Sequence, residues 1–200
     1  MKVHNKPLLS SLFLAVLLCL AFISAKPTSV AYREKVKKDE AVSGISDYLR
    51  DAKMKFKDNK LRAISESIYD ESMRYNIDYR LILALMKIES NFRYDAVSEK
   101  GARGLLQVKP SVARYVAKDV GVEWRGDETL HEPEENIRIG VHFFSKLVED
   151  FQCTHMALHA YHVGPTRLRE ILNEKKVPQK GYLNLVLEEY GRNSVLLPPP

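Results

Sequence analysis

Cysteine is almost missing from this 200-residue chain, which contains only Cys19 and Cys153. Cys19 lies in an N-terminal segment that we expect to be removed, so no intramolecular disulfide can form in the remaining chain. We expect the Cys153 thiol to be buried rather than reactive. Lipid attachment at Cys19 is disfavoured, because Leu18 stands where a lipoprotein signal has a small residue.

Long apolar runs are also missing, apart from one near the N-terminus. Lys2 and Lys6 precede an apolar run from Leu8 to Ile23, and Ser24-Ala25 offers small residues for cleavage. This order is typical of a secretory signal peptide, and the run is short for a membrane-spanning helix. The sequence therefore predicts a signal peptide over residues 1–25, export to the periplasm, and membrane contact only through this signal. An uncleaved anchor is the alternative.

A strong excess of one charge sign is missing too. The chain has 31 Lys and Arg against 26 Asp and Glu, for a formal net charge of +5. A nucleic-acid-binding domain normally carries a pronounced basic patch or stripe, which no segment here supplies. We therefore expect a surface of mixed charge and no nucleic-acid partner.

The chain divides into four segments. Residues 26–59 are rich in both charge signs and poor in apolar periodicity, which predicts a charged, partly helical linker. Residues 60–192 show helical periodicity almost throughout, without the alternation of a substantial sheet. Residues 193–200 end in three prolines, which predicts a loose tail. The expected fold is mainly α, with at most a small β element and with helices at residues 61–75, 78–90, 111–119, 134–150, 155–161, 165–173 and 181–190.

Glu89 ends an otherwise apolar helical row. Ile82, Leu85, Met86 and Glu89 follow the i, i+3, i+4, i+7 spacing of one helix face. A carboxyl group partly withdrawn from water has a raised pKa and can donate a proton near neutral pH. Glu89 is therefore a candidate general acid, and a solvated glutamate at a helix end is the alternative.

Five short motifs then follow in order. In order they are Glu89-Ser90, GARGLLQVKP at 101–110, NIRIG at 136–140, AYHVGP at 160–165 and Gly181-Tyr182. Together they resemble the catalytic domain of the soluble lytic transglycosylases, members of the lysozyme superfamily that cleave the glycan strands of peptidoglycan. The resemblance covers roughly residues 64–192. It implies a lysozyme-like helical domain with an active-site cleft.

The resemblance implies a lytic reaction that uses one acid. Glu89 would protonate the β-1,4 oxygen between N-acetylmuramic acid and N-acetylglucosamine, and the substrate's own N-acetyl carbonyl would stabilise the cationic carbon. Ionised Glu89 would then take the proton of the C6 hydroxyl, whose oxygen closes a 1,6-anhydro ring without consuming water. The implied partner is the peptidoglycan glycan strand, and no cofactor is implied.

The resemblance also assigns side chains that bind substrate. Ser98 and Gln107 would hydrogen-bond the sugar near the scissile bond, with capping of their own loop as the alternative. Tyr161 and Tyr182 would offer ring faces to sugar and hydroxyls to Glu89 or substrate, with a place in the core as the alternative.

Three residues have an expected supporting role, and two depart from the family pattern. Ser90 and Asn91 would fix the helix end beside the acid, and Asn136 would tie loops together. His162, at the place of a usual asparagine, joins the substrate-binding set and adds a group that titrates near neutral pH. Lys109 stands where a methionine is common and could contact an anionic peptide on the substrate.

A metal site is a competing interpretation of the histidines. His155, His159 and His162 recur on one predicted helix face near Cys153, and zinc favours such ligands. Three ligands along one straight helix span too far to meet one ion, and no other ligand cluster is evident. We therefore expect no metal, and a polar helix face explains the spacing.

Two other functions stay open. A hydrolytic muramidase on the same fold would need a second carboxylate to position water, and Asp95, Glu99 and Asp127 are candidates. A non-catalytic glycan-binding or secretion-scaffold protein would bind the same strands without turnover. The small size of the chain favours a partner in secretion or cell-wall machinery.

Overall fold

The computed structural model describes the backbone from residue 9 and the side chains from residue 30. The predicted signal peptide, residues 1–25, lies outside the described side chains. The chain forms two units, Met1–Asp39 and Glu40–Pro200. Among the residues from 30 onward, no helix is both long enough and apolar enough to cross a membrane.

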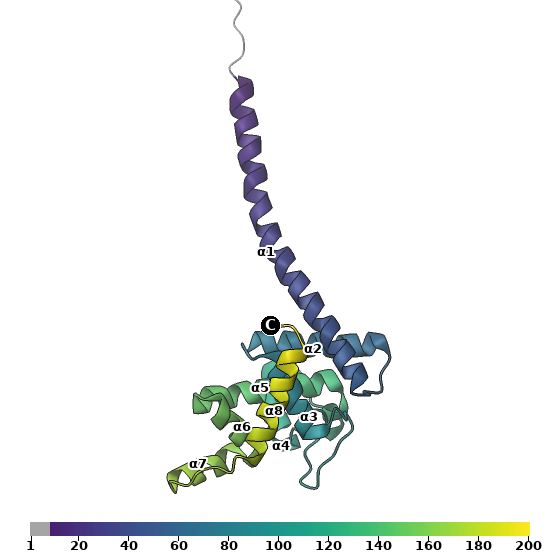
Figure 1. Ribbon diagram of the computed structural model, residues 1–200, viewed down its shortest axis with the longest axis vertical. Coiled ribbons are helices and arrows are strands. Elements are labelled where there is room, and N and C mark those ends of the chain that lie inside the picture. The colour runs from purple at the N-terminus through teal and green to yellow at the C-terminus, as the bar shows by residue number, and fades with distance from the viewer. Residues whose placement is uncertain (1–8) are drawn as a thin grey trace, which may run out of the picture. The chain divides into compact units, whose positions relative to one another are not determined.

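Helices make up most of the described chain (Figure 1). Extended pairing within residues 9–200 consists of isolated bridges from Arg103 to Val97 and Val108. The prediction of a mainly α fold with a small β element is therefore confirmed. The elements are α1 (Leu9–Asp51), α2 (Asp58–Arg74), α3 (Tyr79–Ser90), α4 (Pro110–Val116), η1 (Ala117–Val120), η2 (Asp127–His131), α5 (Pro133–Phe151), α6 (Thr154–Val163), α7 (Pro165–Asn173) and α8 (Gly181–Leu196).

Local sequence accounts for several helix ends. Helices α4, α5 and α7 each have a proline in the first turn, where its missing N–H has no intrahelical partner to lose. The Asp78 carboxylate caps α3 by accepting from the Arg80 N–H at 2.9 Å. Asn91 ends α3 in the left-handed conformation, with φ of 52°.

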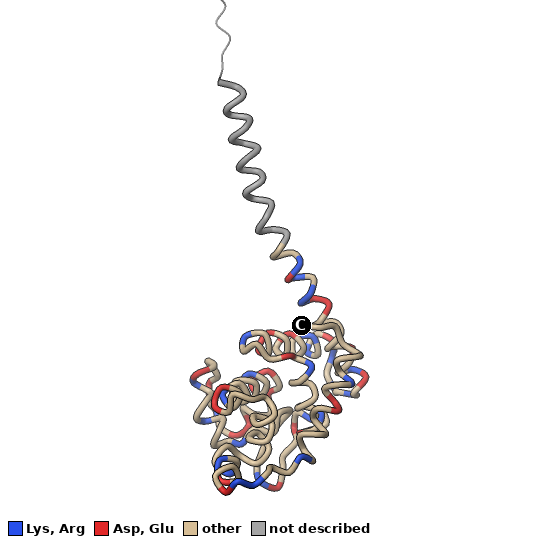
Figure 2. Tube along the Cα trace, turned by 60° about the vertical axis from the view of Figure 1, so that its left-hand side comes forward, with Lys and Arg blue, Asp and Glu red and all other residues tan. Residues whose placement is uncertain are grey.

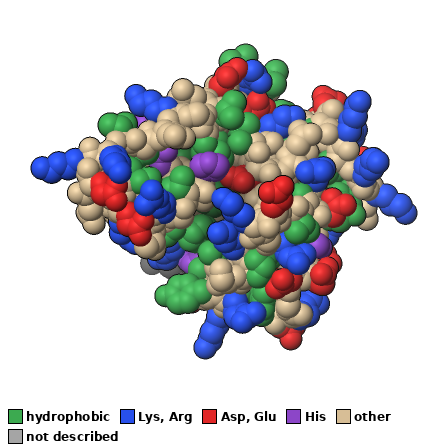
Figure 3. Space-filling view, turned by 90° about the horizontal axis from the view of Figure 1, so that it is seen from below, with side chains coloured by type: hydrophobic (Ala, Val, Ile, Leu, Met, Phe, Trp, Pro, Cys, Tyr) green, Lys and Arg blue, Asp and Glu red, His purple; other side chains and the backbone are tan. Residues whose placement is uncertain are grey.

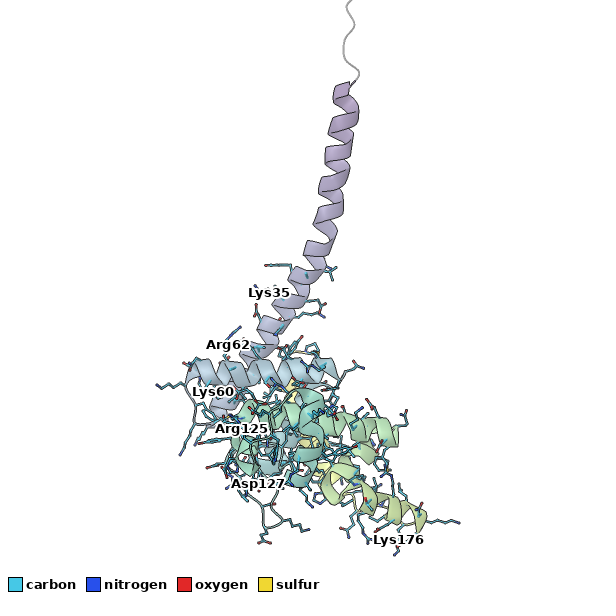
Figure 4. All side chains as sticks on the ribbon, turned by 180° about the vertical axis from the view of Figure 1, so that it is seen from behind. Lys35, Lys60, Arg62, Arg125, Asp127 and Lys176 are labelled. Carbon is cyan, nitrogen blue, oxygen red and sulfur yellow. The ribbon has the colours of Figure 1, made fainter. Side chains whose placement is uncertain are left out.

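Helix α3 lies at the centre of the second unit. Its residues from Leu81 to Met86 are buried, so the helix is covered on nearly every side. It packs against α8, and α2 packs against α5. An ion pair of 2.7 Å between Lys60 Nζ and Glu134 Oε2 joins the first turns of α2 and α5, with Lys60 labelled in Figure 4.

The second unit begins earlier than the predicted linker boundary at residue 59. Helix α1 continues to Asp51, and its last turns bury Val42, Ile45 and Leu49 completely. Ser46 Oγ also donates to Ser65 Oγ at 2.9 Å. These apolar positions fall on one helix face, but the charged residues around them hide the pattern in the sequence.

The C-terminal residues are packed rather than loose. Helix α8 runs to Leu196, and Asn193 Nδ2 donates to the Arg80 carbonyl oxygen at 3.0 Å. Leu197 is only 7% exposed, and the Tyr79 hydroxyl donates to the Pro198 carbonyl oxygen at 2.5 Å. The prolines end the helix, as predicted, but the tail then lies against the start of α3.

Truncation tests where the second unit begins. We expect a chain starting at Glu40 to unfold cooperatively, whereas a chain starting at Lys60 should fail to fold stably. The longer deletion removes Val42, Ile45 and Leu49, and burial of each contributes about 1.5–3 kcal/mol, a large part of the stability of a typical domain. Thermal unfolding followed by circular dichroism measures both. Equal midpoints for the two chains would contradict this boundary.

Candidate active site

A cavity of about 700 Å³ lies beside the C-terminal end of α3. Five predicted site residues line it together: Glu89, Ser98, Gln107, Tyr161 and His162. They come from α3, from the loop before α4 and from the end of α6. The rest of the lining consists of Lys100, Ala102, Val108, Lys109, Val112, Phe143, Val163, Gly164, Pro165 and Arg167.

Glu89 is partly buried at the last turn of α3 and accepts a short hydrogen bond from the Tyr182 hydroxyl at Oε1. Burial raises the pKa of Glu89, because the ionised form loses water. The Tyr182 bond works in the opposite direction and lowers the pKa, but burial has the larger effect. Glu89 therefore holds its proton to a higher pH than an ordinary glutamate does.

Tyr182 and His162 form a stacked pair beside Glu89. Their ring centroids are 4.2 Å apart and their planes differ by 12°. Burial and then the charge of Glu89 raise the pKa of Tyr182, while burial and then the charge of Lys100 lower the pKa of His162. Tyr182 does not line the cavity, and His162 covers one face of its ring. The Tyr182 hydroxyl thus bonds the acid, while its ring is stacked on His162.

Tyr161 belongs both to the cavity wall and to the core. Its hydroxyl donates to the Leu106 carbonyl oxygen at 2.7 Å. Its ring lies against Phe143 and Phe144, with centroids 5.6 Å and 5.9 Å away. The Tyr161 hydroxyl is therefore already bonded within the protein, and the ring is the part of the side chain that is left to form the cavity wall.

Ser98 and Gln107 cap their own loop and also line the cavity. Ser98 Oγ accepts from the Ala102 N–H at 3.0 Å. Gln107 Nε2 donates to the carbonyl oxygens of Ala96 and Gly104, at 3.2 Å and 3.0 Å. These bonds engage the Gln107 amide nitrogen, so its amide oxygen is the atom suited to accept from a ligand.

Three supporting residues hold the loop that follows α3. Ser90 Oγ donates to the Leu105 carbonyl oxygen at 2.8 Å, and Asn91 ends α3 with Lys87 Nζ donating to its Oδ1 at 2.6 Å. Asn136 Oδ1 accepts from the Leu106 N–H at 2.8 Å. Asn136 Nδ2 donates to the Arg103 and Leu130 carbonyl oxygens, both at 2.9 Å. None of the three lines the cavity.

Two glycines allow this loop to approach its neighbours. A Cβ atom on Gly104 would lie 2.2 Å from Asn136 Nδ2, and one on Gly140 would lie 2.6 Å from Leu106 Cδ1. Gly104 also has a φ of +75°, which other residues rarely adopt. Gly104 of the 101–110 motif and Gly140 of the 136–140 motif therefore both allow the close contact between the loop and α5.

The candidate metal ligands are not gathered at one point. His155 lines a separate cavity of about 380 Å³, whereas His162 stacks on Tyr182. Within residues 30–200 no three His, Cys, Asp or Glu side chains are placed to hold an ion. Cys153 precedes α6 and is exposed, so the expectation of a buried thiol is wrong. A short loop between two helices leaves this position open to solvent.

None of the three candidate second carboxylates lines the cavity that holds Glu89. Asp95, Glu99 and Asp127 are absent from the cavity lining. Asp127, labelled in Figure 4, is 3.4 Å from Arg103 Nη2 through its Oδ2. Among the described residues that line the cavity, Glu89 is the only acid.

Several lining residues have no clear signal in the sequence. Phe143 lies three residues after Gly140 on α5, and Lys100 lies two residues after Ser98. Arg167 follows the 160–165 motif closely. Proximity to a motif could have suggested each of them, but only the packing of α5 and α7 around the loop brings them to one cavity.

Known proteins with this helical arrangement are lysozyme-like lytic transglycosylases. The lytic transglycosylase Slt from Pseudomonas aeruginosa, solved as an inactive glutamate-to-glutamine mutant, superposes with a TM-score of 0.51 at 25% identity, over 65% of this chain and 22% of that chain. The family model "Transglycosylase SLT domain" matches residues 66–184. The chain belongs to this family.

Curated relatives share the same region. Membrane-bound lytic murein transglycosylase C of Photorhabdus laumondii is 41% identical over 86 residues, which are 42% of this chain and 24% of the relative. Endo-type membrane-bound lytic murein transglycosylase A of Klebsiella pneumoniae is 40% identical over 77 residues, which are 36% of this chain and 37% of the relative. The matches thus span well under half of these relatives.

Asn136→Ala tests the anchor of the loop. We expect the free energy of unfolding to fall by about 3 kcal/mol or more, because three buried backbone groups lose their partner and each costs about 1–3 kcal/mol. Urea denaturation measures this loss. Asn184→Ala, at an exposed position of α8, is the matched control and should change stability by less than about 0.5 kcal/mol. Equal losses in the two variants would count against the anchor.

Tyr182→Phe tests the balance at the acid. We expect the pKa of Glu89 to rise further, because the lost hydrogen bond favours the ionised carboxylate. A carbon-13 NMR titration of the Glu89 carboxyl group measures it. Tyr161→Phe removes a hydroxyl that bonds Leu106 instead, so it should leave this titration nearly unchanged. A lower Glu89 pKa in Tyr182→Phe would contradict the assigned role of the bond.

Proposed function

We propose that this chain is a peptidoglycan lytic transglycosylase that cleaves the β-1,4 bond between N-acetylmuramic acid and N-acetylglucosamine. The observation that carries the proposal is the single acid of the cavity, Glu89, whose pKa is raised by burial. Membership of the SLT family supports it. So does the inactive glutamate-to-glutamine mutant of the Pseudomonas aeruginosa enzyme, a property stated of that protein.

Glu89 would act first as general acid. Protonated Glu89 donates its proton to the glycosidic oxygen, and the bond from this oxygen to C1 of the muramic acid breaks. With no second carboxylate in the lining, the substrate's N-acetyl carbonyl oxygen stabilises the positive charge at C1. Ser98 and the Gln107 amide oxygen, from residues that line the same cavity, would orient hydroxyl and N-acetyl groups during this step.

Glu89 would then act as base. The ionised carboxylate takes the proton of the C6 hydroxyl on the same muramic acid, and the C6 oxygen forms the new bond to C1. This closes the 1,6-anhydro ring, restores the Glu89 proton and consumes no water. The Tyr182 hydroxyl stabilises the ionised carboxylate between the two proton transfers, because it donates to Oε1.

The same proposal places the reaction outside the cytoplasm. The apolar N-terminal pattern supports export, and two of the matched relatives are named membrane-bound.

A hydrolytic muramidase is the alternative reaction, but it needs a carboxylate to activate water, and Asp95, Glu99 and Asp127 do not line the cavity.

Mass spectrometry of released muropeptides tests the reaction. We expect the chain to release products one water lighter than hydrolysed muropeptides, and Glu89→Gln to lower the release at least about a thousandfold, because it removes the proton donor and base. Glu99→Gln, at an exposed position in the next loop, is the matched control and should retain activity. Reducing-end products would indicate a muramidase, and full activity of Glu89→Gln would contradict the role of the acid.

A further inference from the structure

The cavity lining has a bias of charge that the rest of the second unit lacks. Along residues 40–200, Lys and Arg positions are interspersed with Asp and Glu positions (Figure 2). The lining, in contrast, contains Lys100, Lys109 and Arg167 but only one acid, Glu89. Three cations against one acid leave the lining as a whole cationic.

Lys100 and Lys109 are the two cations available to a ligand. Both are exposed, and among the residues with described side chains neither forms an ion pair with a carboxylate. Arg167 differs, because its Nη1 lies 2.8 Å from Glu170 Oε2. Glu99 neighbours Lys100 in sequence but does not line the cavity. The two lysines therefore present uncompensated charge to whatever occupies the cavity.

Both lysines lie close to the proposed chemistry. Lys100 follows the Ser98 turn, and its charge contributes, after burial, to the lowered pKa of His162. Lys109 directly precedes α4, two residues after Gln107. The face seen in Figure 3 carries basic and histidine side chains among hydrophobic ones. A group bound at these lysines would thus belong to the same ligand as the sugar near Glu89.

We propose that Lys100 and Lys109 form a binding site for carboxylates carried on the muramic acid side arm of the glycan strand. This proposal rests on the proposed function and specifies which strands the cavity takes. A muramic acid offers a carboxylate from its lactyl group when it is bare, or several from its peptide when it is substituted. Ammonium groups at the rim recognise either source, whereas they gain nothing from a neutral sugar polymer.

Binding without turnover gives the first test. Full-length protein with Glu89→Gln is compared with the same protein carrying Lys100→Gln and Lys109→Gln, by co-sedimentation with peptide-bearing sacculi. We expect the Kd to rise about three- to tenfold, as two exposed charge pairs allow, and the difference to shrink as salt increases. Unchanged affinity would overturn the proposal.

Two matched variants separate a specific site from bulk charge. Lys55→Gln with Lys118→Gln removes the same charge from exposed positions outside the cavity, and its affinity should stay within about twofold of the parent's. Lys100→Arg with Lys109→Arg keeps the charge and should retain most of the parent's affinity. A loss in the distant pair equal to that in the cavity pair would overturn the site.

Chemically altered strands identify the carboxylate. On strands whose peptides have been removed by an amidase, a persisting effect of the lysine variants shows that the lysines also bind the lactyl carboxylate that the amidase exposes, and a vanished effect assigns the peptide alone. On strands whose carboxylates have all been amidated, the variants and the parent should bind equally. A variant effect that survives amidation would overturn the proposal.

Measurements of kcat and KM distinguish this proposal from the proposed function. With Glu89 intact, the lysine variants should raise KM about three- to tenfold and leave kcat within about twofold, because the lysines would contact the side arm of the muramic acid and not the atoms of the scissile bond. A kcat loss without a KM change would overturn the binding role. If the parent chain releases no muropeptides, the proposed function fails, and the binding comparisons still decide on the two lysines.

Discussion

The site depends on one mostly buried stretch of backbone, residues 103–106, whose polar groups are largely withdrawn from water. Each of these groups must find a partner inside the protein, because an unsatisfied buried amide or carbonyl costs about as much as a hydrogen bond contributes. Side chains from three helices supply them: Asn136 from α5, Ser90 from α3 and Tyr161 from α6. The loop is therefore the point at which the helix that carries the acid and two walls of the cavity are joined.

This arrangement explains why residues that never touch a ligand share motifs with residues that do. Ser90 holds the loop and stands next to Glu89, and Tyr161 holds the loop through its hydroxyl while its ring lines the cavity. Gln107 directly follows Leu106 in the chain, so its position at the cavity depends on the position of Leu106. A substitution at Asn136 would therefore shift several residues of the cavity together, because the same stretch of backbone positions all of them.

Local patterns were sufficient for the parts of the fold that rest on helical spacing. The apolar row ending at Glu89 predicted both the α3 helix and a partly buried acid, since the i, i+3, i+4, i+7 spacing fixes one face irrespective of the remaining fold. The mainly α class was predictable for the same reason. The last turns of α1 were not, because the buried Val42, Ile45 and Leu49 are set among charged residues and become a core face only in the folded chain, where the end of α1 contacts α2, α8 and Phe92.

The long-range contacts of the site had no local signal in the sequence. The family resemblance, and no local pattern, implied that the Tyr182 hydroxyl could reach Glu89, and nothing indicated that His162 stacks on Tyr182, because α6, α8 and α3 meet only through tertiary packing. The packed C-terminal residues are another case: the prolines rightly predicted the end of α8, but the bond from Tyr79 to Pro198 depends on α8 lying along α3. The local sequence determines where a helix ends, whereas the packing of one helix on another depends on the whole fold.

The charges and the burial of the cavity together affect the protonation of Glu89. Lys100 and Lys109 favour a negative charge in the cavity, yet burial still keeps the pKa of Glu89 raised, because both lysines are exposed and water screens them. A glycan strand that fills the cavity would displace water from Glu89 and bring carboxylates to the lysines. Both changes disfavour ionised Glu89, so the strand itself would help to keep the acid protonated until the glycosidic oxygen is in reach.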